Sequence, residues 1–180
     1  MTSPHVLEQA AGIETMSTDN QATDTQSSLA KALTRRAKLM ELTQASYEAA
    51  LLPEEPGGLD YAERAALACR MARICQQQGL SQHYEELLAS CTDTQASTDG
   101  ISALASPDTQ PPADDARLQA IVAYVDKVTR SPKDAVPDDI ESLRAAGMDE
   151  SDIVRLAGLV AFVNYQLRVA AVLAVMGDSP

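Results

Sequence analysis

The residues in this sequence best suited to chemistry are a cysteine and a histidine in the stretch RICQQQGLSQHY, residues 73–84. Cys75 is a nucleophile when its thiol is ionised, and His83 can exchange a proton near neutral pH. Three interpretations are open: a working thiol site, the remains of one, or a polar helix end with a semi-buried structural cysteine. No CxxC pair occurs and His5 lies far from His83, so we predict neither a metal site nor a cofactor.

Composition limits the partners and the compartment. The 180-residue chain has a formal net charge of -12 and a pI of about 4.4. This charge argues against nucleic acids and anionic membranes as partners, because both bind clustered lysine and arginine. The three cysteines are an odd number and the N-terminus has no secretory-signal pattern, so we expect free thiols in the cytoplasm.

Hydrophobic periodicity places these residues on helices, and no stretch alternates as a strand would. We expect an all-α protein of six or seven helices without a β-sheet. Residues 1–28 are predicted to be mostly disordered, with a short docked helix in HVLEQAAGI. Residues 29–178 are predicted to form one helical domain, with a mobile loop at about 90–115. The main predicted helices are residues 28–52, 59–78, 81–89, 116–130, 137–146 and 149–176.

Three positions should define helix ends. Asp60 is a favourable N-cap, and Glu63 three residues later would complete a capping box, which explains this glutamate without catalysis. Gly79 should end the helix that carries Cys75, and Gly147 should end the short helix that begins at Pro137.

The most apolar stretch, residues 153–176, is long enough to cross a bilayer. It contains two arginines and two amide side chains, so we predict a core helix or a subunit interface and no membrane span.

Asn164 and Arg168 lie four residues apart in this stretch and share a helix face. They could form a structural polar pair with Asp126 or Glu63 as the acidic partner, or they could line a pocket for a small molecule.

Two longer stretches carry a resemblance to a known family. They are AALLPEEPGGLDYAERAALACRMARI and YVDKVTRSPKDAVPDDIESLRAAGMDESDIVRLAGLVAFVNYQLRVAAVL. Both resemble the carboxymuconolactone decarboxylase and alkylhydroperoxidase D (AhpD) superfamily, in particular its peroxidase-related two-part members. The resemblance covers about residues 6–177 and implies an AhpD-like helical fold in a symmetric oligomer, a dimer or larger.

Active members of that family use a glutamate, a CxxC pair and a histidine that follows the pair. By this resemblance, Glu63 occupies the position of the proton-relay glutamate and Cys75 that of the first cysteine. Gln78 occupies the position of the second cysteine, and His83 lies one residue beyond the position of the histidine. The chain is thus similar to a subgroup of the family that lacks the redox pair.

These features lead to three hypotheses. The first is a non-catalytic or divergent relative of the antioxidant, peroxidase-related proteins. The second is a one-cysteine thiol peroxidase that uses Cys75. The third is a thiol-independent lactone decarboxylase with His83 as its base. Whether the protein is an enzyme at all depends on whether Cys75, His83 and Glu63 meet in space.

Overall fold

The computed structural model describes residues 6, 31–91, 100–101 and 103–177. Within these residues the chain is helical and has no strand, which confirms the predicted all-α class. The docked helix expected in HVLEQAAGI and the disorder expected for residues 1–28 lie outside the described residues, apart from Val6. The helices are α3 (Ala37–Leu51), α4 (Tyr61–Ile74), α5 (Gln78–Cys91), α7 (Ala116–Arg130), the 3-10 helix η1 (Pro132–Asp134), α8 (Pro137–Ala145) and α9 (Glu150–Gly177).

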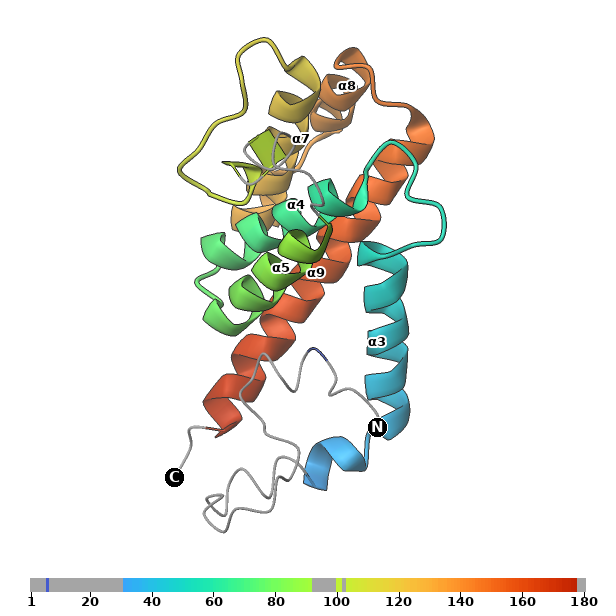
Figure 1. Cartoon of the computed structure of the whole chain (residues 1–180), viewed down its shortest axis with the longest axis vertical. Coiled ribbons are helices and arrows are strands. Elements are labelled where there is room, and N and C mark those ends of the chain that lie inside the picture. The colour runs from blue at the N-terminus through green and yellow to red at the C-terminus, as the bar shows by residue number, and fades with distance from the viewer. Residues whose placement is uncertain (1–5, 7–30, 92–99, 102, 178–180) are drawn as a thin grey trace.

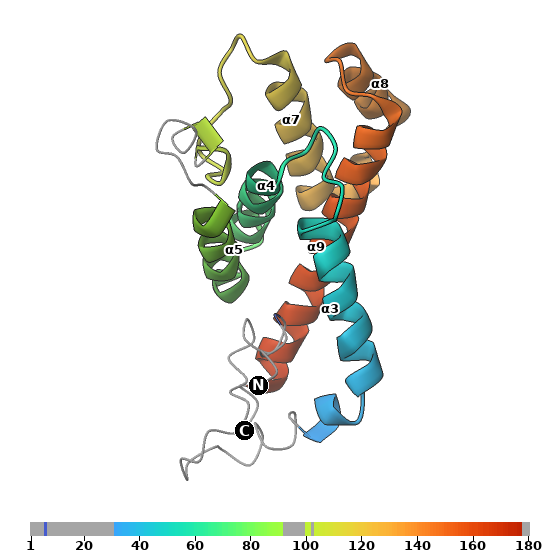
Figure 2. The same cartoon turned by 45° about the vertical axis from the view of Figure 1, so that its right-hand side comes forward.

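The longest helix, α9, forms the spine of the molecule (Figure 1). It packs against α3, α4, α7 and α8. Helix α3 runs antiparallel to α9 along its middle part, whereas α7 and α8 lie near the N-terminal end of α9 (Figures 1 and 2). Helix α4 sits between α9 and α5, and its contact with α5 is the most extensive between any two of these helices. Helix α4 is therefore surrounded by other helices, since it also contacts α7 and α3.

Helix α4 is buried because its sequence is rich in alanine. Alanine favours the helix and adds little bulk, so neighbouring helices can pack closely around it. Ten of its fourteen residues are buried. They are Ala62, Arg64, Ala65, Ala66, Leu67, Ala68, Cys69, Arg70, Met71 and Ala72. Two of these are arginines, whose charges must be compensated inside the protein.

Two predicted helix boundaries are wrong. The helix expected over 28–52 is interrupted by a turn at residues 35–36, and α3 begins at Ala37. Nearly every side chain from residue 31 to residue 39 is exposed, and a short helix without tertiary packing is marginal in water. The helix expected to continue to Gly79 ends instead at Ile74, so Gly79 lies in the first turn of α5.

Two other predicted ends are confirmed. The side chain of Asp60 accepts a hydrogen bond from the backbone N–H of Glu63 at 2.7 Å, as an N-cap does. Gly147 has φ of +88° directly after α8, where the left-handed region favours glycine.

Arg70 joins α4 to α7 and to the chain that precedes α7. Its side chain is fully buried and makes a two-pronged ion pair with Asp126, at 2.6 and 3.0 Å. The same guanidinium donates to the carbonyl oxygens of Leu104, Ser106, Pro107 and Thr109. These carbonyls belong to the segment predicted to be a mobile loop. Its mobility stays a prediction, although Arg70 gives this part of it a buried anchor.

Loss of the Asp126 carboxylate should destabilise the fold. Burial acts to raise the pKa of Asp126, but hydrogen bonds from Arg70 and Arg130 outweigh it and lower that pKa. Because Asp126→Asn leaves Arg70 buried without its counter-charge, we expect the free energy of unfolding at pH 7 to fall by about 3 kcal/mol. Urea unfolding followed by circular dichroism measures this loss.

The same pair predicts a pH dependence. A carboxyl group with a lowered folded-state pKa stabilises the protein above its unfolded-state pKa of about 3.9, and this contribution disappears as the pH falls through the folded-state value. The gap between wild type and Asp126→Asn should therefore narrow below about pH 4. Glu141→Gln, which removes an exposed ion pair with Arg144, is the control and should have little effect. A gap that stays constant with pH would contradict this assignment.

Candidate functional site

Cys75 lies at the corner between α4 and α5. It is the C-cap of α4, and its backbone N–H donates to the carbonyl oxygen of Met71 at 3.1 Å. Cys75 is exposed, yet the protein around the sulfur removes enough water to raise the pKa of the thiol. The positive charge of Arg168 on α9 opposes this effect without cancelling it. Cys75 is therefore accessible but mainly protonated at neutral pH.

The turn after Cys75 separates the two positions that the family resemblance pairs. Gln76 has φ of +56°, and this left-handed residue closes α4 with hydrogen bonds from Gln76 N to Arg73 O and from Gln77 N to Ala72 O. These two bonds are those of a helix-ending Schellman motif, in which glycine usually occupies the left-handed position. Gln78 then begins α5. Positions 75 and 78 consequently belong to different helices and do not share a helical turn.

Glu63 lies in the first turn of α4, at the end of the helix remote from Cys75. A rise of about 1.5 Å per residue puts about 18 Å between them along the axis. The Glu63 carboxylate accepts hydrogen bonds from Arg117 of α7, at 2.7 and 3.2 Å. The predicted capping box is therefore only half formed, because the Glu63 side chain is bonded to Arg117 rather than returning to the backbone of Asp60.

His83 is paired with a tyrosine rather than with the thiol. Its Nε2 shares a hydrogen bond of 2.9 Å with the hydroxyl of Tyr47 on α3. Burial lowers the pKa of His83, with Glu86 acting in the opposite direction, and burial raises the pKa of Tyr47 to about 12, helped by Cys91 and Glu48. The pair is therefore neutral at pH 7. Among the described residues, no hydrogen bond joins Cys75 to His83 or to Glu63.

Asn164 and Arg168 are in contact, as their spacing predicts. Asn164 is buried and donates to the carbonyl oxygen of Val160 at 3.0 Å, and Arg168 donates to the backbone and side-chain oxygens of Asn164 at 2.9 and 3.3 Å. Arg168, in contrast, is exposed. A long arginine near the surface keeps its charged end in water while its stem covers the helix.

The acidic partners expected for Arg168 bond to other arginines. Asp126 accepts from Arg70 and Arg130, and Glu63 accepts from Arg117. Arg168 instead lies near enough to Cys75 for its charge to act on the thiol, although the two residues belong to different predicted sites. A cleft of about 470 Å³ lies between α3 and α9, and none of the five predicted site residues lines it.

The sequence patterns did not identify several polar residues that prove to be buried in the structure. Arg64 and Arg70 are fully buried cations, and Tyr47 and Gln166 are buried partners of His83 and Tyr84. The arginines carry a signal that could have been used, since a charged residue inside an alanine-rich, otherwise buried helix must have a specific partner. The tyrosine and the glutamine carry no such signal, because both residue types are common on helix surfaces.

Comparison with known proteins rests on structure alone, because no protein-family profile and no curated protein sequence matches the chain. One similar structure is an uncharacterized peroxidase-related protein from Silicibacter sp. TM1040. The TM-score is 0.65 and the identity 21%, over 97% of this chain and 93% of that one. A second, from Ralstonia eutropha JMP134, is an uncharacterized peroxidase-related protein described as an alkylhydroperoxidase AhpD core. It gives a TM-score of 0.52 at 20% identity, over 83% of this chain and 80% of that one.

The chain has the AhpD-like helical fold. This confirms the fold that the two resembling stretches implied, and it extends over nearly the whole chain. At this level of identity the likeness concerns the backbone, and the chemistry of an AhpD-like fold resides in its side chains. The roles of Cys75, His83 and Glu63 in this chain therefore have to be argued from their own contacts.

The effect of the Arg168 charge on the Cys75 thiol predicts how fast the thiol reacts. Iodoacetamide attacks the thiolate, so the raised pKa should slow alkylation of Cys75 at pH 7.5 relative to the urea-unfolded chain. Arg168→Gln removes the charge that lowers this pKa, so alkylation should slow further, by about twofold to fivefold. Mass spectrometry of the Cys75 peptide measures the rate. Arg144→Gln, an arginine change on α8, is the matched control, and equal rates in both variants would refute the coupling.

Proposed function

We propose that this protein is a divergent AhpD-like protein that does not run the thiol–disulfide peroxidase reaction and works as a non-catalytic helical binding or assembly module. The observation that carries the proposal is the separation of the predicted catalytic groups. Glu63 pairs with Arg117 at one end of α4, Cys75 caps the other end, and His83 pairs with Tyr47. Such an arrangement lacks the convergence that nucleophile and base need.

The thiol chemistry supports the same conclusion. A thiolate that attacks a peroxide becomes a sulfenic acid, and a second thiol must condense with it to give a disulfide and water. Cys69 is buried, and its sulfur lies 3.6 Å from the carbonyl oxygen of Ser81. Burial also raises the pKa of Cys69, against the effects of Arg73 and Ser81. Cys69 is therefore a poor candidate for the resolving thiol of Cys75.

A second candidate function is a one-cysteine thiol peroxidase or antioxidant enzyme. Its support is that Cys75 is exposed and lies near a cation, Arg168. In this reaction a first external thiol would condense with the sulfenic acid to give a mixed disulfide and water, and a second external thiol would then release the Cys75 thiol and form a disulfide of the two external thiols. The lactone decarboxylase hypothesis ranks lower, because the hydrogen bond to Tyr47 occupies Nε2 of its only candidate base, His83.

Peroxide turnover distinguishes these candidates. We expect the purified protein to consume hydrogen peroxide, with dithiothreitol as reductant, no faster than its Cys75→Ser variant. Dimedone should trap no sulfenic acid on Cys75, because the protonated thiol is a weak nucleophile. Cys69→Ser is the control for reactions at another cysteine. Turnover that disappears in Cys75→Ser and persists in Cys69→Ser would refute the non-catalytic proposal and establish the one-cysteine enzyme.

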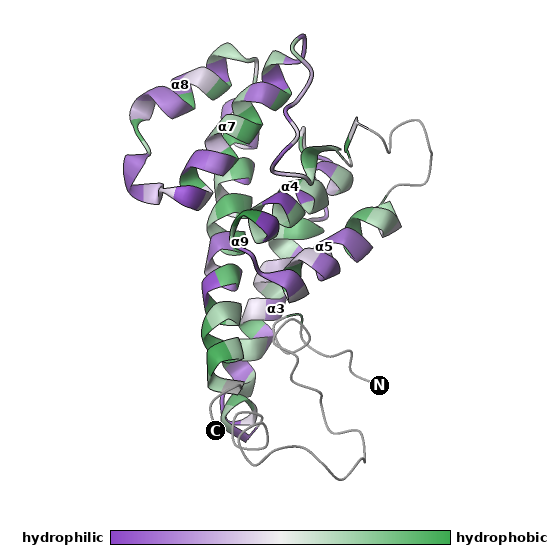
Figure 3. Cartoon of the chain, turned by 90° about the vertical axis from the view of Figure 1, so that its left-hand side faces the viewer, coloured by the Kyte–Doolittle hydropathy of each residue, from purple (hydrophilic) through white to green (hydrophobic). Residues whose placement is uncertain are grey.

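Self-association is a further part of the proposal. Helices α3 and α9 carry exposed apolar side chains, and Figure 3 shows hydrophobic residues along most of α9. The α3–α9 apolar patch consists of Leu39 and Leu42 on α3 with Tyr165 and Val172 on α9. A hydrogen bond of 3.3 Å between Thr43 and Tyr165 aligns these antiparallel helices, so the four side chains lie along the same stretch of the pair. Exposed apolar side chains on two neighbouring helices favour a second copy of the chain as their cover.

The α3–α9 apolar patch predicts that the protein forms an oligomer and that a charge placed in the patch dissociates it. We expect the wild type to elute, in size-exclusion chromatography with light scattering, at twice the chain mass of 19.2 kDa or at a higher multiple. Val172→Asp should shift it toward the single-chain mass, because an interface cannot bury an unpaired carboxylate without a large penalty. Val154→Asp is the matched control, since this valine is also exposed on α9 but remote from the patch. A wild type of single-chain mass would contradict this proposal.

The compartment also stays a proposal. The three cysteines are free, which fits the reducing cytoplasm. Helix α9 is long and apolar enough to cross a membrane, and 44% of its most apolar window is buried inside the protein. Its contacts with four other helices support the role of a core helix.

A further inference from the structure

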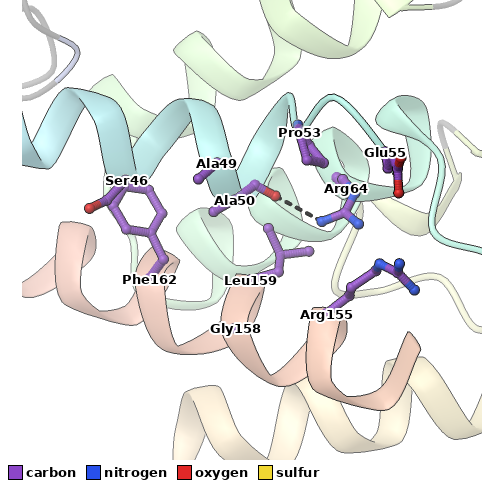
Figure 4. Close-up of a pocket in the computed structure, with 10 residues that line it drawn as sticks. All are labelled: Ser46, Ala49, Ala50, Pro53, Glu55, Arg64, Arg155, Gly158, Leu159 and Phe162. Carbon is purple, nitrogen blue, oxygen red and sulfur yellow. Dashed lines mark hydrogen bonds between the residues drawn. The ribbon is translucent and has the colours of Figure 1, made fainter. Parts of the chain in front are cut away.

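The cleft between α3 and α9 has properties that none of the three hypotheses uses. Its volume is about 470 Å³, which suits a small organic molecule. Two arginines lie at one end, and aliphatic and aromatic side chains line the other (Figure 4). The lining residues come from α3, the turn at 53–58, α4 and α9, so the cleft depends on the complete tertiary fold.

Arg64 is the fixed cation of the cleft. Only 2% of its surface is exposed, and three of its N–H groups donate to carbonyl oxygens, those of Ala50, Pro56 and Leu59, at 2.7 to 2.9 Å. These neutral acceptors hold the guanidinium in place without cancelling its charge. A guanidinium has five N–H donors, so two remain for a ligand. Arg64 is therefore a pre-organised donor for an anion.

Arg155 brings a second positive charge to the same end. Burial lowers the pKa of Arg64 and the charge of Arg155 lowers it further, whereas Asp152, Glu63 and Tyr61 act in the opposite direction. Gly57 lies against the Arg155–Asp152 ion pair, because a Cβ there would lie 2.7 Å from Nη1 of Arg155 and 2.7 Å from Oδ1 of Asp152. Gly57 also has φ of +67°, where other residues are strained. The turn thus leaves room for this ion pair beside the cleft.

Two carboxylates stand near these arginines. Asp152 accepts hydrogen bonds from Arg155 at 2.9 Å and from the backbone N–H of Gly58 at 3.0 Å, so Asp152 and Arg155 offset part of each other's charge. Glu55 lines the cleft and is exposed. One opposing carboxylate at the rim tolerates a ligand with a single negative charge and disfavours a doubly charged one. The charge pattern therefore selects a monoanion.

The other end of the cleft is apolar and has open space beside a glycine. Leu159 and Phe162 line it, together with alanines of α3. Gly158 lies in the interior of α9, where glycine costs about 1 kcal/mol relative to alanine. A Cβ at Gly158 would meet no atom within 4 Å, so packing does not require the glycine. The missing side chain leaves room for a ligand.

From these observations we infer that the cleft binds a small monocarboxylate with an apolar tail, with the carboxylate on Arg64 and Arg155 and the tail against Leu159 and Phe162. Carboxylate matches the fork of N–H donors that guanidinium groups present. The inference is independent of Cys75 and of the peroxidase question.

Isothermal titration calorimetry of the full chain with octanoate tests this inference. We expect octanoate to bind, and octanol, which has the same tail without the charge, to bind at least about tenfold more weakly. Arg155→Gln should weaken octanoate by about tenfold or more, since it removes a charged donor. Glu55→Gln should strengthen it, because the opposing charge is gone. Arg64 is left unchanged in these tests, since its carbonyl bonds also support the fold.

Two substitutions of Gly158 distinguish a loss of octanoate binding caused by filling the cleft from one caused by misfolding. Gly158→Met should abolish octanoate binding by filling the apolar end, whereas Gly158→Ala should leave binding nearly unchanged and raise the Tm by about 2–4 °C. Arg144→Gln, remote from the cleft, should bind octanoate as the wild type does. No octanoate binding, equal affinity for octanol, or equal losses in Arg155→Gln and Arg144→Gln would each overturn the inference.

Discussion

The buried guanidinium of Arg70 is the constraint on which much of this fold depends. A cation without solvent needs a counter-charge and acceptors for its remaining N–H groups. Asp126 supplies the charge from α7, and four backbone carbonyls between α4 and α7 supply the rest. These hydrogen bonds attach α7 and the segment before it to a single guanidinium group on α4. The position of α4 in turn sets where α5 and α9 pack.

A second buried arginine on the same helix is held differently. Arg64 has carbonyl acceptors but no directly bonded carboxylate among the described residues, and it borders open space rather than a filled core. The two arginines lie six residues apart, so they point from different faces of α4. One closes the structure against α7, and the other faces the cleft beside α9. The fold thus separates a structural cation from one that is available to a ligand.

Local chemistry predicted part of the candidate site and misjudged the rest. Asp60 and Gly147 behave as their residue types predict, because caps and left-handed turns depend on nearby backbone. Gln76 was not predicted, since a left-handed glutamine costs about 1 kcal/mol or more and persists only where surrounding contacts support it. That single residue moves the end of α4 from Gly79 to Ile74 and puts positions 75 and 78 on different helices.

The sequence by itself determined the helical class, the AhpD-like fold and the identity of the polar residues, because periodicity, capping and family motifs are all local patterns along the chain. The tertiary structure decided which of those residues meet. Glu63 contacts Arg117, 54 positions away, and His83 contacts Tyr47, 36 positions away. Arg168 lies near Cys75 instead of an acid. Such partners depend on how the helices pack. The free energy of packing comes from many contacts between residues that are distant in the sequence, and a local sequence pattern contains no information about them.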